Sequence, residues 1–240
     1  MQVPGRDERG ELARGRLLVA VLAAVDERAG AWLRAALDAA DDARAVDIAF
    51  GSAPRRVGTA PLESGARGPT RDLGLSGPAR HAAEAARMLI ALAHSDHDPD
   101  APERLRRHAD VDESVAIYRA LALFAPGTRL DAAVGRGLRT HAKPVFEAIA
   151  HANPWPAANL DEHRWNHLVL KALFIDSALD PILGLDARAN PTLARMLLDF
   201  ADERLAAGRK VPAELWRCAL PFASPERLAR HAPPSGALPA

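Results

Sequence analysis

Apolar residues recur along this chain at intervals of three and four, which is the spacing of one face of a helix. The first such run lies between Leu17 and Leu37 and comprises Leu18, Leu22, Val25, Ala29, Trp32, Leu33 and Leu37. The sequence VDERAG within this run predicts a turn that divides it into a helical hairpin. Alternating runs of Val, Ile and Thr, which would indicate strands, are absent, and alanine is abundant. The fold class is therefore predicted to be all-α.

The same periodicity, together with start and stop signals, predicts further helices. They span about 43–50, 78–94, 103–108, 110–124, 131–151, 161–174, 190–207, 212–220 and 224–231. Pro78 opens the second of these, and Asp110 and Glu113 have the spacing of a capping box. Pro144 is expected inside the 131–151 helix, where its missing backbone N–H would bend the helix.

Residues 51–70 are rich in glycine and proline and are predicted to be a loop, made basic by Arg55 and Arg56. Successive helices of about 10–20 residues joined by short polar turns favour antiparallel hairpins stacked as an irregular, helical-repeat-like array. A compact orthogonal bundle is the alternative. We expect disordered tails at residues 1–10 and 232–240 and a single domain over residues 11–231.

The stretch from Asn153 to Phe222 has the most sharply defined helix signals. Asp161 is expected to cap a helix that has apolar residues on both faces, with Trp165 on one side and Phe174 nearly opposite. Both aromatic side chains are therefore expected to be buried. Asn190 is expected to cap the next helix, ahead of a proline at its first position.

The charge balance of the sequence excludes a strong global electric field. Lysine plus arginine number 31, and aspartate plus glutamate also number 31, in 240 residues. Such a chain is not attracted as a whole to nucleic acid or to an anionic membrane, so neither is expected as a partner. The hydrophobic fraction of 48% is sufficient for a globular core.

The sequence also predicts where the protein resides. Cys218 is the only cysteine, so no intrachain disulfide can form, and a reducing compartment is favoured. The first residues carry charges of both signs before any apolar run, unlike a signal peptide. The apolar run LLVAVLAAV is far shorter than the ~20 residues that span a bilayer. We therefore expect a cytoplasmic protein without a membrane span.

Few patterns point to catalysis or to a metal. His163 and His167 have metal-ligand spacing but no assigned third ligand, so a solvated pair is favoured. The loop 96–100 is rich in aspartate but lacks EF-hand spacing, so a plain surface loop is favoured. The GRG at residues 135–137 follows no predicted strand, and no nucleophile motif occurs. No catalytic residue, metal or cofactor is therefore predicted.

Polar residues on otherwise apolar helices are the candidates for a binding site. One interpretation is a buried salt-bridge network, for instance Glu147 with Arg204. The other is a concave pocket for a ligand with an apolar body and a polar or anionic head. Trp155, which lies between two prolines, is predicted to be a rigid aromatic residue in an exposed turn, suited to a pocket lid or a protein-interaction hot spot. The ligand-binding candidates are Arg55, His141, Lys143, Glu147, Trp155, Arg164, Trp165, Asn166, His167, Lys171 and Arg204.

Several segments resemble the EboA family, which is described as metabolite-traffic components in bacteria and some algal lineages. The resemblance is carried by WNHLVLKALF, GLDARANPTLARML, ADERLAAGR and ELWR, and it extends upstream through VFEAIAHANPWPA, IYRALALF and APRRVGTAPL. It covers most of the chain beyond about Phe50. Family members tend to have Tyr where this chain has Trp155, and Pro144 stands where an ordinary helix residue is expected. Both departures bear on a binding surface.

The resemblance implies a pathway role more than a chemical one. The genes of the family accompany a prenyltransferase-like membrane protein, barrel enzymes and a sugar-cyclase-like enzyme, and the group is associated with moving precursors out of the cytoplasm. The main hypothesis is a non-catalytic accessory protein of secondary metabolism that binds a pathway intermediate, prenylated or phosphorylated, for handling or export. The first alternative is an adaptor that docks a membrane or barrel-enzyme partner of the same gene cluster. The second is an unrecognised enzyme using His141, Glu147 or Lys171.

Overall fold

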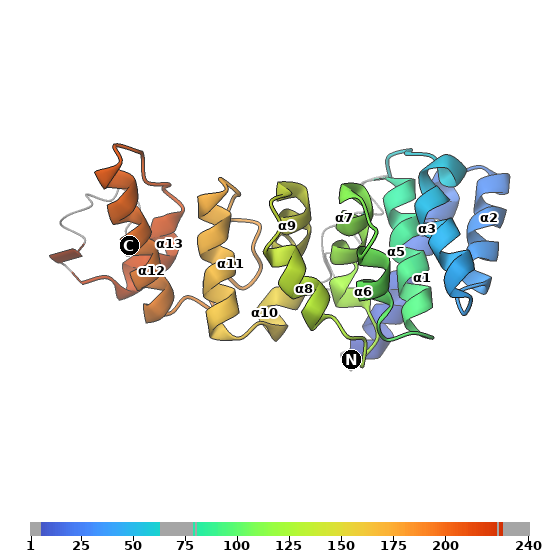
Figure 1. The fold of residues 1–240 in the computed structure, drawn as a ribbon, viewed down its shortest axis with the longest axis horizontal. Helices are drawn as coiled ribbons and strands as arrows, with labels where there is room; N and C mark the ends of the chain where they lie inside the picture. The colour runs from blue at the N-terminus through green and yellow to red at the C-terminus, as the bar shows by residue number, and fades with distance from the viewer. Residues whose placement is uncertain (1–5, 63–78, 80, 225, 228–240) are drawn as a thin grey trace, which may run out of the picture. The chain divides into compact units, whose positions relative to one another are not determined.

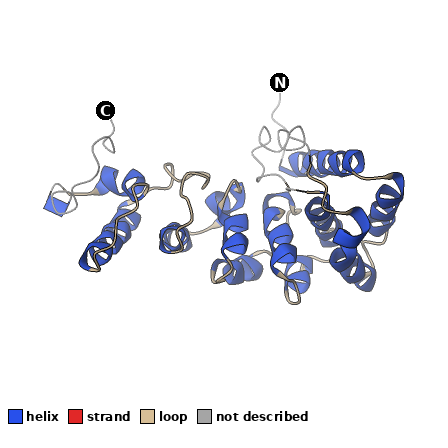
Figure 2. Ribbon diagram, turned by 90° about the horizontal axis from the view of Figure 1, so that it is seen from above, coloured by secondary structure: helices blue, strands red, loops and turns tan. Residues whose placement is uncertain are grey.

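The structure is a computed structural model that describes residues 6–62, 79, 81–224 and 226–227 (Figure 1). Its helices are α1 (Arg6–Ala24), α2 (Glu27–Asp38), α3 (Ala43–Val57), α5 (Ala82–Ser95), α6 (Ala101–Arg106), α7 (Val111–Arg119), α8 (Asp131–Leu138), α9 (Lys143–Ala150), α10 (Pro154–Asn159), α11 (Glu162–Phe174), α12 (Pro191–Ala206) and α13 (Leu215–Ala219). Two 3-10 turns lie at Leu121–Leu123 and Leu220–Phe222. No strand occurs in these described ranges (Figure 2), and the all-α prediction is confirmed.

The contacts within the chain group it into two compact units, residues 1–154 and residues 155–240. The single domain expected over residues 11–231 stays a prediction. In the first unit α3, α5, α7 and α9 are neighbours in that order. This succession agrees with the predicted array. In the second unit α12 packs against both α11 and α13.

Helix α5 forms the centre of the first unit. It packs against α1, α2, α3, α6 and α7, and all its residues except Ala93 are buried. Its alanine-rich sequence leaves short side chains on every face, so neighbouring helices can approach closely. Glu84 and Arg87 are buried within this helix, and a buried charge needs a partner. Arg119 of α7 supplies one partner, at 2.8 Å from Glu84.

Side-chain caps confirm several predicted helix starts. Asp110 accepts from the backbone N–H of Glu113, whose own carboxylate accepts from the N–H of Asp110, which completes the predicted capping box. Asp161 caps α11 and Asn190 caps α12, as predicted. The turn after α1 is also confirmed, because Asp26 caps α2 there.

Pro144 does not bend a continuous helix, so that prediction is wrong. Helix α8 ends at Leu138, and Pro144 lies in the first turn of the separate helix α9. A proline is tolerated there because the N–H groups of a first turn have no partner within the helix.

Helix α3 is longer than predicted and includes residues assigned to the basic loop. It runs to Val57 with Pro54 inside it, and Arg55 and Arg56 lie in its last turn. Cationic side chains are favourable there because carbonyl groups at a helix C-terminus carry partial negative charge. The prediction that the loop begins at residue 51 is therefore wrong.

The ends of the chain differ in part from expectation. Helix α1 begins at Arg6, so the predicted tail over residues 1–10 is too long. Pro78 and the tail 232–240 lie outside the described residues. At the predicted last helix, Ser224 accepts from the N–H of Arg227 at 3.4 Å.

Helix α11 buries one face rather than two. Trp165 is fully buried, as predicted, but Phe174 is 74% exposed, so the prediction for Phe174 is wrong. Phe174 is the last residue of α11, and the buried positions of the helix form a single stripe that ends at Leu173. The apolar residues on the opposite face of α11 therefore do not indicate that another helix packs against that face.

Gly137 of α8 lies where α8 meets α7 and α9. A Cβ atom at this position would lie 2.5 Å from Ile149 Cδ1 and 2.6 Å from Tyr118 Cζ. We therefore expect Gly137→Ala to lower the free energy of unfolding by about 1–3 kcal/mol, because two packed side chains must shift. Denaturation followed by circular dichroism measures the change.

The control for this prediction is Gly15→Ala in α1. A Cβ at Gly15 meets no atom within 4 Å, and alanine is favoured over glycine in a helix by about 1 kcal/mol. Equal effects of the two substitutions would contradict the packing role of Gly137.

Candidate functional site

The predicted ligand-binding residues are divided between the two units. Arg55, His141, Lys143 and Glu147 belong to the first unit, and the remaining candidates belong to the second. Lys143 and Glu147 form an ion pair of 3.8 Å along α9. None of the predicted residues lines either of the two cavities described below.

Trp165 is the centre of a buried contact in the second unit. The guanidinium of Arg188 lies over the indole, 4.6 Å from the ring centre. The same guanidinium donates to the backbone oxygens of Pro156 at 3.2 Å, Ala157 at 3.0 Å and Leu160 at 2.8 Å. These carbonyls lie in α10 and directly after it, and that of Pro156 also accepts from the N–H of Leu160 at 3.0 Å. Arg188 therefore joins α10 to α11.

The indole N–H of Trp165 is buried and finds no hydrogen-bond acceptor among the described residues. Buried polar groups are usually paired, so this atom is an exception. The guanidinium of Arg188 is attracted to the face of the indole, but it has no acceptor and does not satisfy this N–H group.

Asn166 is also buried and is engaged with Asn190. Asn190 Nδ2 donates to Asn166 Oδ1 at 2.9 Å, and Asn166 Nδ2 donates to Asn190 Oδ1 at 3.2 Å. Asn190 Oδ1 additionally accepts from the N–H of Leu193 and so caps α12. This reciprocal pair ties α11 to the start of α12 and favours a structural role for Asn166.

Trp155 does not lie in an exposed turn, so that prediction is wrong. It is 6% exposed and belongs to the short helix α10, whose first residue is Pro154. The prolines on either side of Trp155 fit the first turn of a helix, where no intrahelical N–H bond is lost. Trp155 is therefore not the exposed aromatic residue that the adaptor hypothesis requires for docking to a partner.

Arg204 makes no ion pair with a carboxylate among the residues that the structure describes. Its Nε donates to the backbone oxygen of Lys210 at 2.9 Å, and its guanidinium lies 5.7 Å from the ring centre of Phe200. The side chain thus closes the turn that follows α12. The suggested pair of Arg204 with Glu147 would join residues of different units and stays a prediction.

A cationic strip remains on α11. His163 and His167 are exposed and their rings make an edge-to-face contact at 4.4 Å. Arg164 and Lys171 are half-buried, and burial lowers the pKa of the Lys171 ammonium. Within the described ranges, no three His, Cys, Asp or Glu residues gather closely enough to hold a metal ion.

A cavity of about 460 Å³ opens in the first unit. We call it the α3–α6 cavity, and it is lined by Asp47, Phe50, Gly51, Arg104, Leu105, Arg107, His108 and Glu113. Phe50 and Leu105 are buried and give the cavity an apolar wall. Arg107 and His108 are exposed and bring cationic or hydrogen-bonding groups to its mouth.

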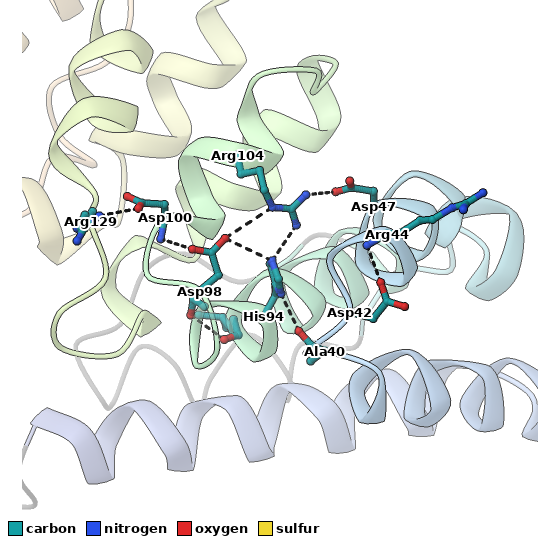
Figure 3. A network of polar contacts seen from close by, with 11 residues as sticks. Ala40, Asp42, Arg44, Asp47, His94, Asp98, Asp100, Arg104 and Arg129 are labelled. Atoms are coloured by element: carbon teal, nitrogen blue, oxygen red, sulfur yellow. Dashed lines mark hydrogen bonds and ion pairs between the residues drawn. The ribbon is translucent and has the colours of Figure 1, made fainter.

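Arg104 is fixed at one side of the α3–α6 cavity by a polar network (Figure 3). Its Nη1 donates to Asp47 at 2.5 Å, and its Nη2 lies 2.8 Å from His94 Nε2. His94 Nδ1 lies 2.7 Å from the carbonyl oxygen of Ala40 and must donate to it. His94 Nε2 therefore acts as the acceptor for Arg104, which assigns the neutral Nδ1–H tautomer.

Glu113 is fixed at another side of the same cavity. Arg87 Nη2 donates to Glu113 Oε1 at 3.2 Å, and Arg87 Nε donates to the backbone oxygen of Phe50 at 3.2 Å. Arg87 also lies over the Phe50 ring, 5.8 Å from its centre. The cavity wall is thus held by a buried ion pair between α5 and the start of α7.

The aspartate loop lies at the surface, as predicted, but its carboxylates have specific partners. Asp96 pairs with Arg14 at 2.7 Å, and Asp100 pairs with Arg129 at 2.6 Å. Asp98 lies 3.7 Å from both His94 Nε2 and Arg104 Nε. The loop therefore ties separate helices together rather than standing apart from them.

The sequence analysis missed the residues that line or support the α3–α6 cavity. Only Glu113 was singled out, and only as part of a capping box. The available signal was charge between alanines, as in AEAARMLIAL, where Glu84 and Arg87 interrupt an apolar run. A buried arginine of this kind requires an acceptor from another helix, but the sequence does not say which one.

Comparison with known proteins identifies one family. The sequence model of the family described as "Metabolite traffic protein EboA" matches residues 15–220. No curated protein and no solved structure matches the chain. Among the described helices, none has the length and apolar character needed to cross a membrane.

Proposed function

Because the chain belongs to the EboA family of metabolite traffic proteins, we propose that it is a non-catalytic accessory protein that holds a pathway metabolite in the α3–α6 cavity. The observation that carries this proposal is the combination of an apolar wall with the exposed side chains of Arg107 and His108 in the lining of one cavity. Its volume of about 460 Å³ lies in the usual range for small-molecule sites, roughly 300–1,000 Å³.

The lining indicates the class of metabolite. Phe50 and Leu105 suit an apolar body, whereas Arg107 and His108 suit an anionic or hydroxylated head. Arg107 is 66% exposed, and its only recorded ion pair among the described residues is a contact of 3.9 Å with Glu103. Its guanidinium can therefore turn to a ligand at small cost. An intermediate of secondary metabolism with a prenyl chain and an oxygen-rich head would satisfy both parts of the cavity.

A binding role agrees with the contacts of Arg104 and Glu113 and with the protonated state of the Cys218 thiol. Arg104 and Glu113 are held by Asp47 and Arg87, so they shape the wall of the cavity. Burial raises the pKa of the Cys218 thiol to about 11, so this thiol stays protonated and is a poor nucleophile. Its reduced state also agrees with our proposal of a cytoplasmic protein.

Calorimetry with candidate precursors of the pathway tests the proposal. We expect a precursor that binds the wild-type protein to bind Arg107→Met about tenfold more weakly, because one charge-assisted contact is lost. The matched substitution Lys171→Met in the second unit removes a cation from the α11 strip. It should leave the affinity unchanged.

The reverse result would contradict the proposal. A loss of affinity in Lys171→Met but not in Arg107→Met would place the ligand at the strip of Arg164, His167 and Lys171. If none of the tested precursors binds, the adaptor hypothesis becomes the better account. Phe174, which is 74% exposed, would then be the first surface residue to replace.

A further inference from the structure

We propose a second binding site, for a small oxyanion, in a separate cavity of the first unit. This cavity has a volume of about 200 Å³. Its lining residues are Arg106, Ala109, Asp110, Val111, Ser114, Tyr118, Arg136, Gly137, Thr140, Ala142 and Val145. We call it the Arg106–Arg136 cavity. It shares no lining residue with the α3–α6 cavity, so the inference does not depend on the proposed function.

Two arginines, Arg106 and Arg136, and one carboxylate, that of Asp110, line this cavity. Glu103 receives both Nε and Nη2 of Arg106, each at 3.2 Å, and it is also contacted by Arg136 Nη2. Arg107 Nε lies 3.9 Å from the same carboxylate. Three guanidinium groups therefore share one carboxylate.

The two arginines that line the cavity retain unused donors. Arg106 keeps Nη1, and Arg136 keeps Nε and Nη1, without an acceptor among the described residues. An arginine offers its N–H groups in a planar fork that matches the oxygens of phosphate and carboxylate groups. The remaining N–H donors of two arginines at one cavity are therefore available to the oxygens of a bound oxyanion.

The rest of the lining is compatible with an anion. Ser114 and Thr140 contribute hydroxyl groups. Tyr118 donates its hydroxyl to the backbone oxygen of Ala133 at 2.7 Å, and burial raises its pKa to about 12, so it remains neutral. The one carboxylate in the lining, that of Asp110, accepts from the N–H of Glu113 and is thereby held at the start of α7.

Glu103 is expected to oppose the binding of an oxyanion, and this effect provides a test of the proposal. Its carboxylate competes with an incoming oxyanion for Arg106 and Arg136. Although burial raises the pKa of Glu103, the hydrogen bonds from the two arginines outweigh it and the pKa is lowered, so the competitor is ionised at neutral pH. Glu103→Gln should therefore strengthen binding, whereas Arg136→Gln should weaken it.

The experiment titrates the full-length chain with inorganic phosphate, and separately with acetate, by calorimetry at low ionic strength. We expect saturable binding of at least one of the two anions, and the comparison decides whether phosphate or carboxylate is preferred. Arg136→Gln should weaken binding about tenfold, and Glu103→Gln should strengthen it several-fold, because the net charge at the cavity changes in opposite directions. Circular dichroism establishes that each variant is folded.

The matched control is Arg129→Gln, which removes an arginine that is 71% exposed and paired with Asp100 away from this cavity. Its affinity for the anion should equal that of the wild type. The proposal is overturned if neither anion binds, if Arg129→Gln weakens binding as much as Arg136→Gln, or if Glu103→Gln leaves the affinity unchanged. If Arg136→Gln fails to fold, Arg106→Gln replaces it with the same expected loss.

Discussion

Replacing Arg87 with methionine is expected to lower the free energy of unfolding by about 3–5 kcal/mol, the usual cost of removing one partner of a buried ion pair. Arg87 is 5% exposed and connects three elements through Glu113, the Phe50 carbonyl and the Phe50 ring. Methionine retains much of the apolar volume of the side chain but none of its donors. The carboxylate of Glu113, 16% exposed, then loses its charged partner.

Chemical denaturation followed by circular dichroism measures this loss. Arg129→Met is the matched control, because it breaks an ion pair whose two side chains are 71% and 53% exposed. Exposed pairs contribute at most about 1 kcal/mol, so the control should be nearly neutral. A further variant, Arg87→Met with Glu113→Gln, should recover part of the lost stability because no uncompensated charge remains. Equal losses in the free energy of unfolding for Arg87→Met and Arg129→Met would contradict the larger stabilisation expected from the buried pair.

The features that sequence analysis predicted correctly are determined within a few residues. Asp110, Asp161 and Asn190 each accept from a backbone N–H group that lies three positions further along the chain. Such contacts form from local chain geometry alone, and the apolar spacing that indicates helices is equally local. The all-α fold and most helix starts could therefore be read without knowledge of the packing.

The features that were not predicted from the sequence, or were predicted wrongly, depend on contacts between residues that are far apart along the chain. Arg87 finds Glu113 26 positions away and Phe50 37 positions away. Phe174 was expected to be buried because its own helix is apolar on that side, but burial requires a neighbour, and the buried stripe of α11 lies elsewhere. The residues that line the α3–α6 cavity were not predicted for the same reason. Polar residues on apolar helices indicate that partners exist, but cavities are formed by helices that meet in space.

Arg188→Met is expected to lower the free energy of unfolding of the second unit by about 2–4 kcal/mol, through lost charge-assisted hydrogen bonds and a lost cation–aromatic contact. The guanidinium of Arg188 serves three carbonyl oxygens at the end of α10 and covers the indole of Trp165. Arg188→Lys should be nearly as harmful, because an ammonium cannot reach three acceptors and stack at once. Denaturation followed by circular dichroism gives the stability.

Arg204→Met is the control that separates this network from a generic effect of removing an arginine. Arg204 also lies near an aromatic ring, that of Phe200, but it makes a single exposed hydrogen bond, to Lys210. Its loss should cost less than about 1 kcal/mol. Since Arg188 contacts the Trp165 indole directly, its removal should also change the fluorescence of the folded protein, which Arg204→Met should not do. A stable Arg188→Met variant with unchanged fluorescence would contradict this role. It would mean that apolar packing alone holds α10 against α11 and that Arg188 does not stabilise their contact.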